Sequence, residues 1–573
     1  MNMQIDAQVA RNYLLSGQFE LAISQYQELI SLTPLNAVLY LELSSALMGL
    51  GKLDEALVVV NQTENLDAAI LHEAKLQRGN IFLAQGRYLD ALTILSPLLS
   101  THCGERARTA LSTAYINIGK PSKASEVLHV IEREKLSIGA INNLAISLCE
   151  QMRVTEALEI LAERIQKGIF DFSTISNILM LSNYSEAPEK YIVIAKHALK
   201  HTEKLTHIPP AKNKSPGHPW QIGFISGDMR QHPVGWFFVA LLKELSAHYK
   251  TVVYYTNHQI DPLTQTIIST ASEFRFIGQI NDGELINQMK QDGNDVLIDL
   301  SGHTAGGRLQ IFNQRIAPKQ LSYLGYFSST YMPEIDGVIF DKKHLDGVPN
   351  DFFTEKVYEL ECSRFNYTAP YAIEIAPLPA LQNKVITFGS FCNTSKISQT
   401  CLNTWATTLK AIPKSKLQLR WKSLQDPQVR KSIRNTFIGL GIENTRVELY
   451  SDCDHESLFH FYNEVDIALD TFPFSGATTC CEALWMGVPV LTRTGSTPAS
   501  NQAASILHQI DLDEYITTSA EEFTAQAIKL TSDLEALSQL RASIRKRFLT
   551  SSLGSPAIFA KHFVRLIEEI TTT

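Results

Sequence analysis

Hydrophobic residues in the first part of the chain recur with a helical period inside a longer repeat of 33 to 35 residues. Each repeat contains a glycine, an apolar residue two positions later and an alanine three positions after that. The pattern begins at Gly17, Gly51, Gly86 and Gly119, and a fifth copy has Met152 in place of the glycine. Small residues let paired helices approach closely, and glycine suits the turn between them. The pattern predicts an α-solenoid over residues 1–200, in which 160–200 have lost the phase, as a capping or docking segment would.

From residue 220 onward, short apolar runs alternate with helical patterns. Strands are expected at 220–226, 251–255, 295–300 and 337–341, and again at 383–391, 417–421, 446–450, 466–469 and 488–491. This alternation predicts two doubly wound parallel sheets, the first with at least four strands and the second with five. Residues 201–219 are rich in Pro, Lys and Ser and are expected to be a linker. The predicted domains are therefore 1–200, 220–375 and 376–573, with 201–219 between the first two.

Composition narrows the class of protein. The 573 residues are 45% hydrophobic and 19% charged, with a formal net charge of −8. These values are typical of a globular protein and argue against a nucleic-acid partner. The sequence has no apolar run of about 18 residues and no basic segment followed by an apolar core, so we expect no membrane span, no signal peptide and a cytoplasmic location. The eight cysteines lack zinc spacing, and we expect no metal.

The stretch 466–492 carries the clearest candidate binding site. A short strand ends near Leu469, a Pro/Gly turn containing Gly476 follows, and a helix opens on Thr478 and Thr479 with Glu482 one turn later. Ligands bind beyond the carboxyl ends of parallel strands, and unpaired N–H groups at a helix start suit a phosphate. Glu482 could accept hydrogen bonds from ribose hydroxyls. The stretch therefore predicts a nucleotide-diphosphate pocket; the alternative is an ordinary strand–turn–helix with a capping threonine.

A lysine lies at the end of another strand of the same lobe. Lys396 follows the strand 383–391 and precedes a helix. Its ammonium could stabilise the charge that builds up on a departing diphosphate. The alternative is a solvated surface lysine. No GxGxxG or Walker A sequence accompanies these elements, which disfavours a dinucleotide or ATP site.

Candidates for proton transfer lie in the first lobe. His232 is in a loop between a strand and a helix, where a histidine can act as a base near neutral pH. His303 lies in a loop of small residues after the strand 295–300, and Asp295 is a further carboxylate candidate. The alternatives are a polar surface histidine at 232 and a tight strand-to-helix turn at 303.

Taken together, residues 217–573 resemble the catalytic region of the O-linked N-acetylglucosamine transferase/SPINDLY family, and the helical repeat resembles the tetratricopeptide repeat that this family also carries. The matching blocks are residues 227–235, 295–304, 317–326, 388–396 and 469–489. The resemblance implies a tetratricopeptide-like α-solenoid followed by a two-lobed GT-B glycosyltransferase. It also implies a metal-independent enzyme without cofactor, whose second lobe binds the sugar nucleotide.

The resemblance also assigns roles to single positions. Asn393 and Lys396 match uridine-diphosphate contacts, Thr478 and Thr479 match groups that hold the diphosphate, and Glu482 matches the ribose carboxylate. His232 matches a histidine that faces the acceptor, and His303 lies in a neighbouring active-site loop. Some positions depart from the family: Ala477 and Leu458, the latter flanked by His455 and His460, stand where many members have histidine, and Ser500-Asn501 stands where Ser-Arg is often found. These departures leave the nucleotide and sugar open.

The functional hypothesis is an inverting transfer of N-acetylglucosamine from its uridine diphosphate to Ser or Thr of a protein. The base is left open between His232, a carboxylate such as Asp295 and the leaving phosphate. Rivals are glucose transfer to Asn, fucose transfer as in SPINDLY-type members, and a catalytically dead repeat adaptor. We expect the repeats and the cleft between the lobes to hold the acceptor, a bacterial surface or flagellar protein being suggested by the family's bacterial members. The alternative for the array is a rigid spacer or a dimerisation arm.

Overall fold

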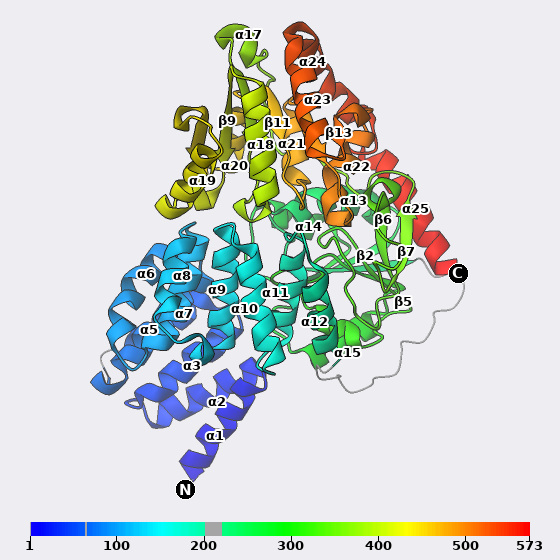
Figure 1. The fold of residues 1–573 in the computed structure, drawn as a ribbon. Helices are drawn as coiled ribbons and strands as arrows, with labels where there is room; N and C mark the ends of the chain where they lie inside the picture. Colours follow the sequence, from blue (N-terminus) through cyan, green and yellow to red (C-terminus); the bar gives the residue numbers. More distant parts are fainter. Residues whose placement is uncertain (1, 64–65, 201–219, 573) are drawn as a thin grey trace. The chain divides into compact units, whose positions relative to one another are not determined.

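The computed structural model describes residues 2–63, 66–200 and 220–572, so the expected linker 201–219 lies outside the described residues. The chain forms two compact units. The first contains Met1–Leu148 and Phe276–Gln288, and the second contains Cys149–Arg275 and Met289–Thr573. Figure 1 follows the chain from its N-terminus (blue) to its C-terminus (red).

Residues 2–199 form a series of helices joined by short turns, as the repeat pattern predicts. Buried alanines stand at the predicted small positions: Ala22, Ala56, Ala91, Ala124 and Ala157. The helices are α1 Asn2–Leu15, α2 Phe19–Leu32, α3 Ala37–Gly49, α4 Leu53–Thr63, α5 Leu71–Ala84, α6 Tyr88–Leu95, α7 Gly104–Asn117, α8 Pro121–His129, α9 Ile138–Glu150, α10 Val154–Gln166, α11 Phe172–Ser182 and α12 Glu189–Leu199.

The turns inside the helix pairs use left-handed backbone. Gly17, Gly51, Gly86 and Gly119 have φ between 69° and 75°, a region that glycine enters without steric penalty. Met152, where the fifth copy lacks the glycine, adopts φ 64°. The helix packing therefore imposes the same turn on a residue that has a Cβ.

The first sheet has seven strands in the order β3-β2-β1-β4-β5-β6-β7. Register pairs such as Ile222 with Thr251 and with Val296 are parallel. Helices α13 Pro233–Ser246, α14 Pro262–Thr270, α15 Asp282–Asp292 and α16 Lys342–Leu345 belong to this part of the chain. The strands are β1 Gln221–Ser226, β2 Lys250–Tyr255, β3 Glu273–Phe276, β4 Val296–Asp299, β5 Lys319–Ser322, β6 Gly337–Asp341 and β7 Lys356–Leu360.

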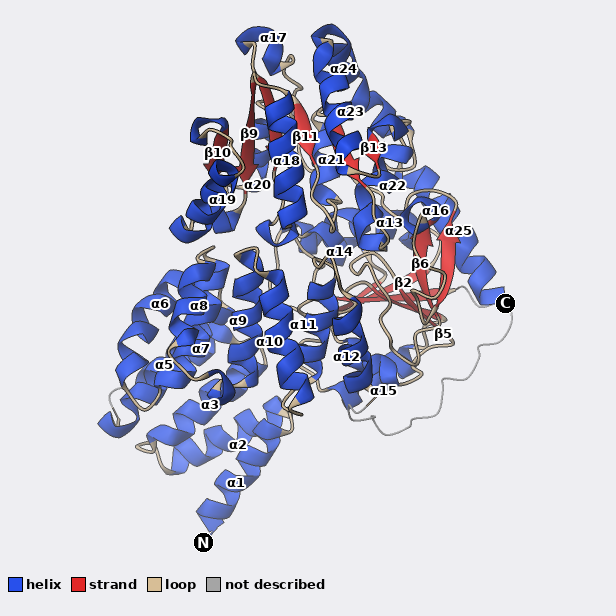
Figure 2. Cartoon of the chain, in the orientation of Figure 1, coloured by secondary structure: helices blue, strands red, loops and turns tan. Residues whose placement is uncertain are grey.

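The second sheet has six strands in the order β10-β9-β8-β11-β12-β13 (red in Figure 2). Its strands are β8 Ile386–Ser390, β9 Ser415–Arg420, β10 Val447–Tyr450, β11 Ile467–Leu469, β12 Val490–Arg493 and β13 Ile516–Thr517. Its helices are α17 Pro379–Asn383, α18 Gln399–Ala411, α19 Pro427–Gly439, α20 His455–Tyr462, α21 Thr478–Trp485, α22 Gln502–His508, α23 Ala520–Ser532 and α24 Leu534–Thr550. A helical array followed by two parallel doubly wound sheets confirms the predicted α-solenoid and GT-B architecture.

Four strands are additional to those expected from the sequence: β3, β5, β7 and β13. Each has two to five residues. β3 and β7 stand at the edges of the first sheet and β13 at an edge of the second, where one side of the strand is unpaired and the side chains are only partly buried. Such segments lack the apolar run that identifies a central strand.

The last helix, α25 Pro556–Thr572, packs on the first sheet although it follows the second in the chain. It contacts α13 and β7, and the ring of Phe563 lies 5.3 Å from that of Tyr323. Glu361 at the end of β7 pairs with Arg565 at 2.8 Å. The final part of the sequence therefore completes the lobe that began at residue 220.

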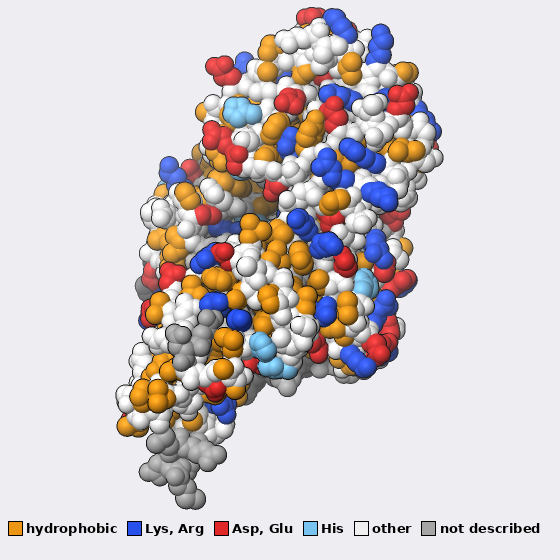
Figure 3. All heavy atoms as spheres, turned by 90° about the vertical axis from the view of Figure 1, so that its left-hand side faces the viewer, with side chains coloured by type: hydrophobic (Ala, Val, Ile, Leu, Met, Phe, Trp, Pro, Cys, Tyr) orange, Lys and Arg blue, Asp and Glu red, His pale blue; other side chains and the backbone are white. Residues whose placement is uncertain are grey.

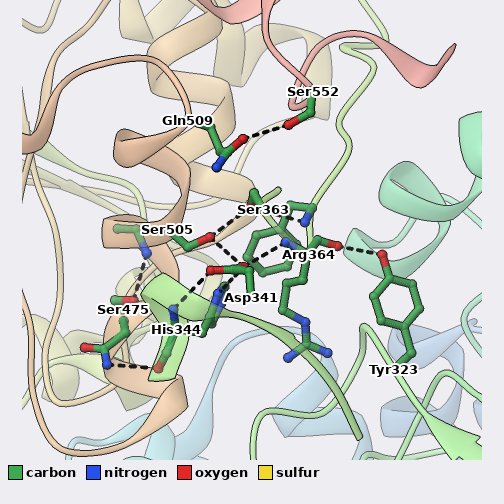
Figure 4. Close-up of polar contacts among 12 residues, drawn as sticks. Tyr323, Asp341, His344, Ser363, Arg364, Ser475, Ser505, Gln509 and Ser552 are labelled. Atoms are coloured by element: carbon green, nitrogen blue, oxygen red, sulfur yellow. Dashed lines mark hydrogen bonds and ion pairs between the residues drawn. The ribbon is translucent and has the colours of Figure 1, made fainter. Parts of the chain in front are cut away.

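Buried polar groups join the two lobes (Figure 4). Asp341 at the end of β6 accepts hydrogen bonds from the Ser505 hydroxyl of α22 at 2.8 Å and from the Arg364 backbone at 2.8 Å, and contacts His344 at 2.7 Å. Asn501 donates to the carbonyls of His344 and Asp346. These bonds tie the segment around α22 to the first lobe, next to the loop that contains Ser475.

The charged side chains and the cysteines have the distribution expected from the composition. On the face drawn in Figure 3, acidic and basic side chains are interspersed, and hydrophobic side chains also reach the surface. All eight cysteines are free thiols, and only Cys453 is not fully buried. Among the described residues, no helix is both long and apolar enough to cross a bilayer.

Candidate active site

Lys396 ends a one-turn 3-10 helix, Thr394–Lys396, just beyond strand β8. Its half-buried side chain donates to the carbonyl of Ser475 at 3.4 Å, and its Nζ lies 4.4 Å from the centre of the Phe474 ring. Burial lowers the pKa of Lys396, while the nearby Cys392 and Asp470 raise it. The ammonium is thus held between two loops of the second lobe, and no carboxylate of the described residues forms an ion pair with it.

Asn393 lies in the same loop and caps the 3-10 helix. Its side-chain oxygen accepts from the backbone N–H of Ser395 at 3.0 Å. Cys392 precedes it, and the Cys392 thiol lies 3.3 Å from the Thr479 hydroxyl. The loop with Asn393 and Lys396 is therefore adjacent to the start of α21, as the sequence predicts for residues at neighbouring strand ends.

Helix α21 begins at Thr478 without a side-chain cap. Its first intrahelical bond is donated by Cys481, so the N–H groups of Thr478, Thr479 and Cys480 have no such partner. Thr478 and Thr479 are partly exposed. The helix start therefore presents hydroxyls and N–H groups of the kind that bind phosphate oxygens.

Asp470 fixes the turn before α21. It accepts the Gly476 N–H at 2.7 Å and the Thr492 hydroxyl at 2.7 Å. A Cβ on Gly476 would lie 2.6 Å from the Thr479 hydroxyl, so a larger residue at this position would displace that hydroxyl. Burial raises the pKa of Asp470 to about 6, against these hydrogen bonds and Lys396, which lower it. Asp470 was not among the candidates taken from the sequence.

Glu482 is buried one turn into α21, with 2% of its surface exposed. Its Oε1 lies 2.8 Å from Nε2 of His455, whereas its Oε2 is buried without a hydrogen-bond partner among the described residues. Burial raises the pKa of Glu482, and His455 opposes that shift. An unpaired buried acceptor in a candidate site fits a ligand that supplies a hydroxyl donor.

His455 is a second site residue, besides Asp470, that sequence reasoning missed. It begins α20 from the second lobe, and its ring lies 5.6 Å from Trp236 of α13, 5.5 Å from Tyr371 and 5.3 Å from Phe459. The sequence shows His455 only as one of two histidines that flank Leu458, and the fold is needed to show which way His455 faces. Because His455 contacts both Trp236 and Glu482, the first turn of α13 lies close to the Glu482 side of the site.

His232 caps that same turn of α13. Its Nδ1 accepts from the Val234 N–H at 3.4 Å and lies 3.5 Å from Asp228, and Nε2 makes no hydrogen bond to the described residues. Burial lowers the pKa of His232, opposed by Asp228. A neutral ring whose Nδ1 accepts a hydrogen bond carries its proton on Nε2. Nε2 can accept a proton only in the other tautomer, in which Nδ1–H is directed at Asp228, so the role of His232 as base stays a prediction.

His303 has a different environment from the one expected. It is 2% exposed, its Nδ1 lies 2.9 Å from the Ser176 hydroxyl of α11, and its Nε2 lies 2.8 Å from the Thr330 carbonyl. Burial lowers its pKa to about 4. With both nitrogens engaged and no free lone pair, His303 fastens α11 to the first lobe, and the expected catalytic role does not fit this geometry.

Asp295 also lies away from the candidate site. It precedes β4, and its carboxylate accepts the backbone N–H of Gln221 at the start of β1 at 2.8 Å. Both positions are at the amino ends of parallel strands, the edge opposite the site. At the carboxyl end of β4, Asp299 accepts from Ser301 and Gly302, and burial raises its pKa to about 7. Asp295 therefore stands at the sheet edge opposite the candidate site, a position that does not favour it as the base.

Comparison with known proteins gives a family match. The sequence model of glycosyl transferase family 41 matches residues 157–365 and 377–563, together more than half of the chain. The matched ranges contain every candidate residue named above.

Individual relatives also match this chain. The chain is 34% identical over 360 residues to the tomato (Solanum lycopersicum) protein named probable UDP-N-acetylglucosamine–peptide N-acetylglucosaminyltransferase SPINDLY, covering 61% of this chain and 38% of that protein. To the Arabidopsis thaliana protein named SEC it is 26% identical over 374 residues, covering 62% and 37%. The chain thus matches under two fifths of the length of these relatives. A solved mutant O-GlcNAc transferase of Thermobaculum terrenum aligns with a TM-score of 0.79 and 26% identity, covering 88% of this chain and 98% of that one.

Proposed function

Because the chain belongs to glycosyl transferase family 41, we propose that it transfers N-acetylglucosamine from UDP-N-acetylglucosamine to Ser or Thr hydroxyls of a protein acceptor. The observation that carries the proposal is the meeting of Lys396 with the uncapped start of α21, across the Cys392–Thr479 contact. The names of the curated relatives support the donor.

The donor diphosphate would bind at the start of α21. The N–H groups of Thr478 and Thr479, which have no partner within the helix, and the hydroxyls of both residues would hold the phosphate oxygens, with Gly476 allowing close backbone approach. Lys396, whose ammonium lies over the Phe474 ring, would neutralise the β-phosphate as the bond to the sugar breaks. Asn393 would bind beside Lys396, and the unpaired Oε2 of Glu482 would accept from a ribose hydroxyl.

Transfer would invert the anomeric centre. The acceptor oxygen attacks C1 of the sugar from the face opposite the diphosphate, the C1–O bond to the β-phosphate breaks, and UDP leaves. The acceptor proton passes to the departing phosphate, or to Nε2 of His232 in the tautomer whose Nδ1–H is directed at Asp228. Positive charge from Lys396 and the helix start does the work that a metal does in other enzymes, so we expect no metal or cofactor.

The test begins with UDP binding measured by calorimetry in EDTA. Replacing Lys396 by Ala removes a charged contact to phosphate, and we expect Kd to rise about 10- to 100-fold. Lys410→Ala is the matched control, because Lys410 is an exposed lysine on the next helix, and it should bind UDP as the wild type does. If the wild type fails to bind UDP, or if Lys396→Ala binds it equally well, the assignment of the site fails.

Turnover then identifies sugar and acceptor. Wild-type protein is incubated with UDP-N-acetylglucosamine and a lysate, and modified peptides are located by mass spectrometry. Modified Ser or Thr with a β-linked product supports the proposal, and activity that is unchanged by EDTA supports metal independence. Glucose on Asn, or binding of GDP and transfer of fucose in parallel arms, would replace the proposal by its rivals. UDP binding without transfer to any acceptor or to water would favour the adaptor. The acceptor's identity as a surface or flagellar protein is tested by the same spectra.

A further inference from the structure

The helices that end the repeat region contact the loops of the candidate donor site. Tyr184, between α11 and α12, lies with its ring centre 4.9 Å from that of Phe474. Phe474 is buried, and Lys396 places its Nζ 4.4 Å above the same ring. On another side, the ring of Phe327 from the first lobe meets Phe474 at 5.6 Å, close to perpendicular. Phe474 is therefore a platform on which three separate segments converge.

A second contact reaches the other end of the Lys396 loop. The hydroxyl of Thr394 donates to the carbonyl of Glu150, the last residue of α9, at 2.8 Å. The Glu150 carboxylate lies 3.5 Å from the Lys422 ammonium. Glu150 and Tyr184 are also close enough for the Glu150 charge to influence the Tyr184 hydroxyl. The Thr394–Lys396 turn is thus supported from outside its own lobe at its first residue and, through Phe474, at its last.

From this geometry we propose that Tyr184 positions Lys396 for donor cleavage by holding the Phe474 ring beneath its ammonium. Tyr184 is a positioning residue, since it acts through Phe474 and touches no reacting atom. The proposal rests on the proposed function in taking Lys396 as the diphosphate contact. It goes beyond it in making the end of the repeat region part of the donor site as well as a support for an acceptor.

The consequence separates donor chemistry from acceptor presentation. If Tyr184 acts on Lys396, its loss slows cleavage of the donor even when water is the acceptor. In that reaction the C1–O bond to the β-phosphate breaks, a C1–O bond to water forms, and UDP and one proton are released. A residue that only presented a protein acceptor would leave this hydrolysis unchanged.

The experiment compares UDP release from UDP-N-acetylglucosamine without acceptor. In Tyr184→Leu the aromatic support is lost, and since a partly desolvated cation–π contact is worth about a factor of ten, we expect kcat to fall about tenfold with KM for the donor within about twofold. Tyr184→Phe keeps the ring and should restore kcat. The matched control is Tyr191→Leu on α12, a buried tyrosine whose ring also lies below a lysine, Lys190, at 4.6 Å, and it should retain the wild-type kcat.

A readout independent of turnover follows the reactivity of the lysine itself. The rate at which acetic anhydride modifies Lys396, measured by mass spectrometry across pH, reports its ionisation. The groups facing Lys396 are Cys392 on its own loop and Asp470 at the end of β11. In Tyr184→Leu water reaches the ammonium, so the burial that lowers its pKa weakens, and the modification profile should move to higher pH.

The outcomes are distinct. Suppose that the wild type hydrolyses the donor and that Tyr184→Leu has the same kcat and the same Lys396 profile. This result overturns the inference and leaves the proposed function intact. If the Lys396 profile shifts in Tyr184→Leu but the wild type neither binds nor cleaves the UDP-sugar, the contact is supported and the proposed donor is overturned. An equal loss of kcat in Tyr191→Leu would assign the effect to general destabilisation and would also overturn the inference.

Discussion

Replacing His455 by Leu should destabilise the second unit by an amount that depends on pH. Among the described residues, only His455 pairs with the buried Glu482 carboxylate, and the His455 side chain is 29% exposed. Leucine keeps much of the ring's packing against Trp236 and Phe459 but leaves both Glu482 oxygens unpaired. Breaking a buried ion pair by removing one partner typically costs about 3–5 kcal/mol.

Protonation sets a ceiling on that cost. A stranded carboxylate can bind a proton, and from the ordinary value of 4.5 this costs about 3.4 kcal/mol at pH 7, at 1.36 kcal/mol per pH unit. At pH 5.5 the same ceiling is about 1.4 kcal/mol. The sign follows from linkage: the pKa of Glu482 is raised in the folded protein, so its favourable neutral form is present at low pH and stability is lost as pH rises through the folded pKa. Without His455 that pKa rises further, and the loss widens toward neutral pH.

The assay is urea unfolding followed by tryptophan fluorescence at pH 5.5 and 7. All five tryptophans lie between Trp220 and Trp485, outside Phe276–Gln288, so the signal reports on the second unit alone. We expect His455→Leu to cost about 2–3 kcal/mol at pH 7 and less than about 1.4 kcal/mol at pH 5.5. In a Glu482→Gln background the same replacement should cost under about 1 kcal/mol, because no charge is stranded. An equal cost at both pH values, or in both backgrounds, would refute the electrostatic account of this pair.

Three further predictions test other parts of the molecule. Gly86→Ala should lower stability by about 1–2 kcal/mol, since φ is +74° and a Cβ there meets nothing within 4 Å, so only backbone strain acts. Gly139→Ala inside α9, which meets only Thr109 at 3.7 Å, should instead gain about 0.5–1 kcal/mol, with both read by thermal melting of helical circular dichroism. His303 should keep a neutral ring to pH 5 in an NMR titration, because its pKa is lowered to about 4. As pH falls through the ordinary pKa of 6.5, the histidine takes up a proton in the unfolded chain but not in the folded one. This group alone should therefore remove about 1.4 kcal/mol of stability between pH 8 and pH 5.5. A ring that titrates near 6.5 would contradict its described hydrogen bonds. Asp295→Asn should leave UDP affinity within about twofold while costing roughly 1 kcal/mol in urea unfolding, and a tenfold loss of affinity would return Asp295 to the site.

The repeats and central strands could be read from the sequence because their signals are local. A glycine at a fixed spacing marks a left-handed turn, and residues 296–298 of β4 are apolar because both faces of a parallel sheet are covered. The turn at Met152 could not be predicted in this way, because it has no glycine and the packing of the neighbouring helices maintains its left-handed backbone. Edge strands such as β13 escaped detection because their pairing depends on a partner far along the chain.

The candidate site divides in the same way. Lys396, Thr478 and Glu482 follow strands with clear carboxyl ends, so their approach to one another could be foreseen. Asp295 and His303 have the right chemistry in the wrong place: one stands at the start of its strand, and the other is turned toward α11. His455 and Tyr184 were not foreseen, because only packing between segments distant in sequence gives them their roles.

The return of α25 to the first sheet bears on the order in which the protein can be made. Residues Phe559, Phe563, Ile567 and Ile570 are buried, and they belong to a helix that contacts α13 and β7. During synthesis the strands of the first lobe leave the ribosome well before the helix that covers them. That lobe therefore exposes apolar surface until residues 556–572 have been translated, a state in which a nascent chain is prone to association and to chaperone binding. Two halves expressed apart and divided near residue 376 would for the same reason leave the first half without its last helix.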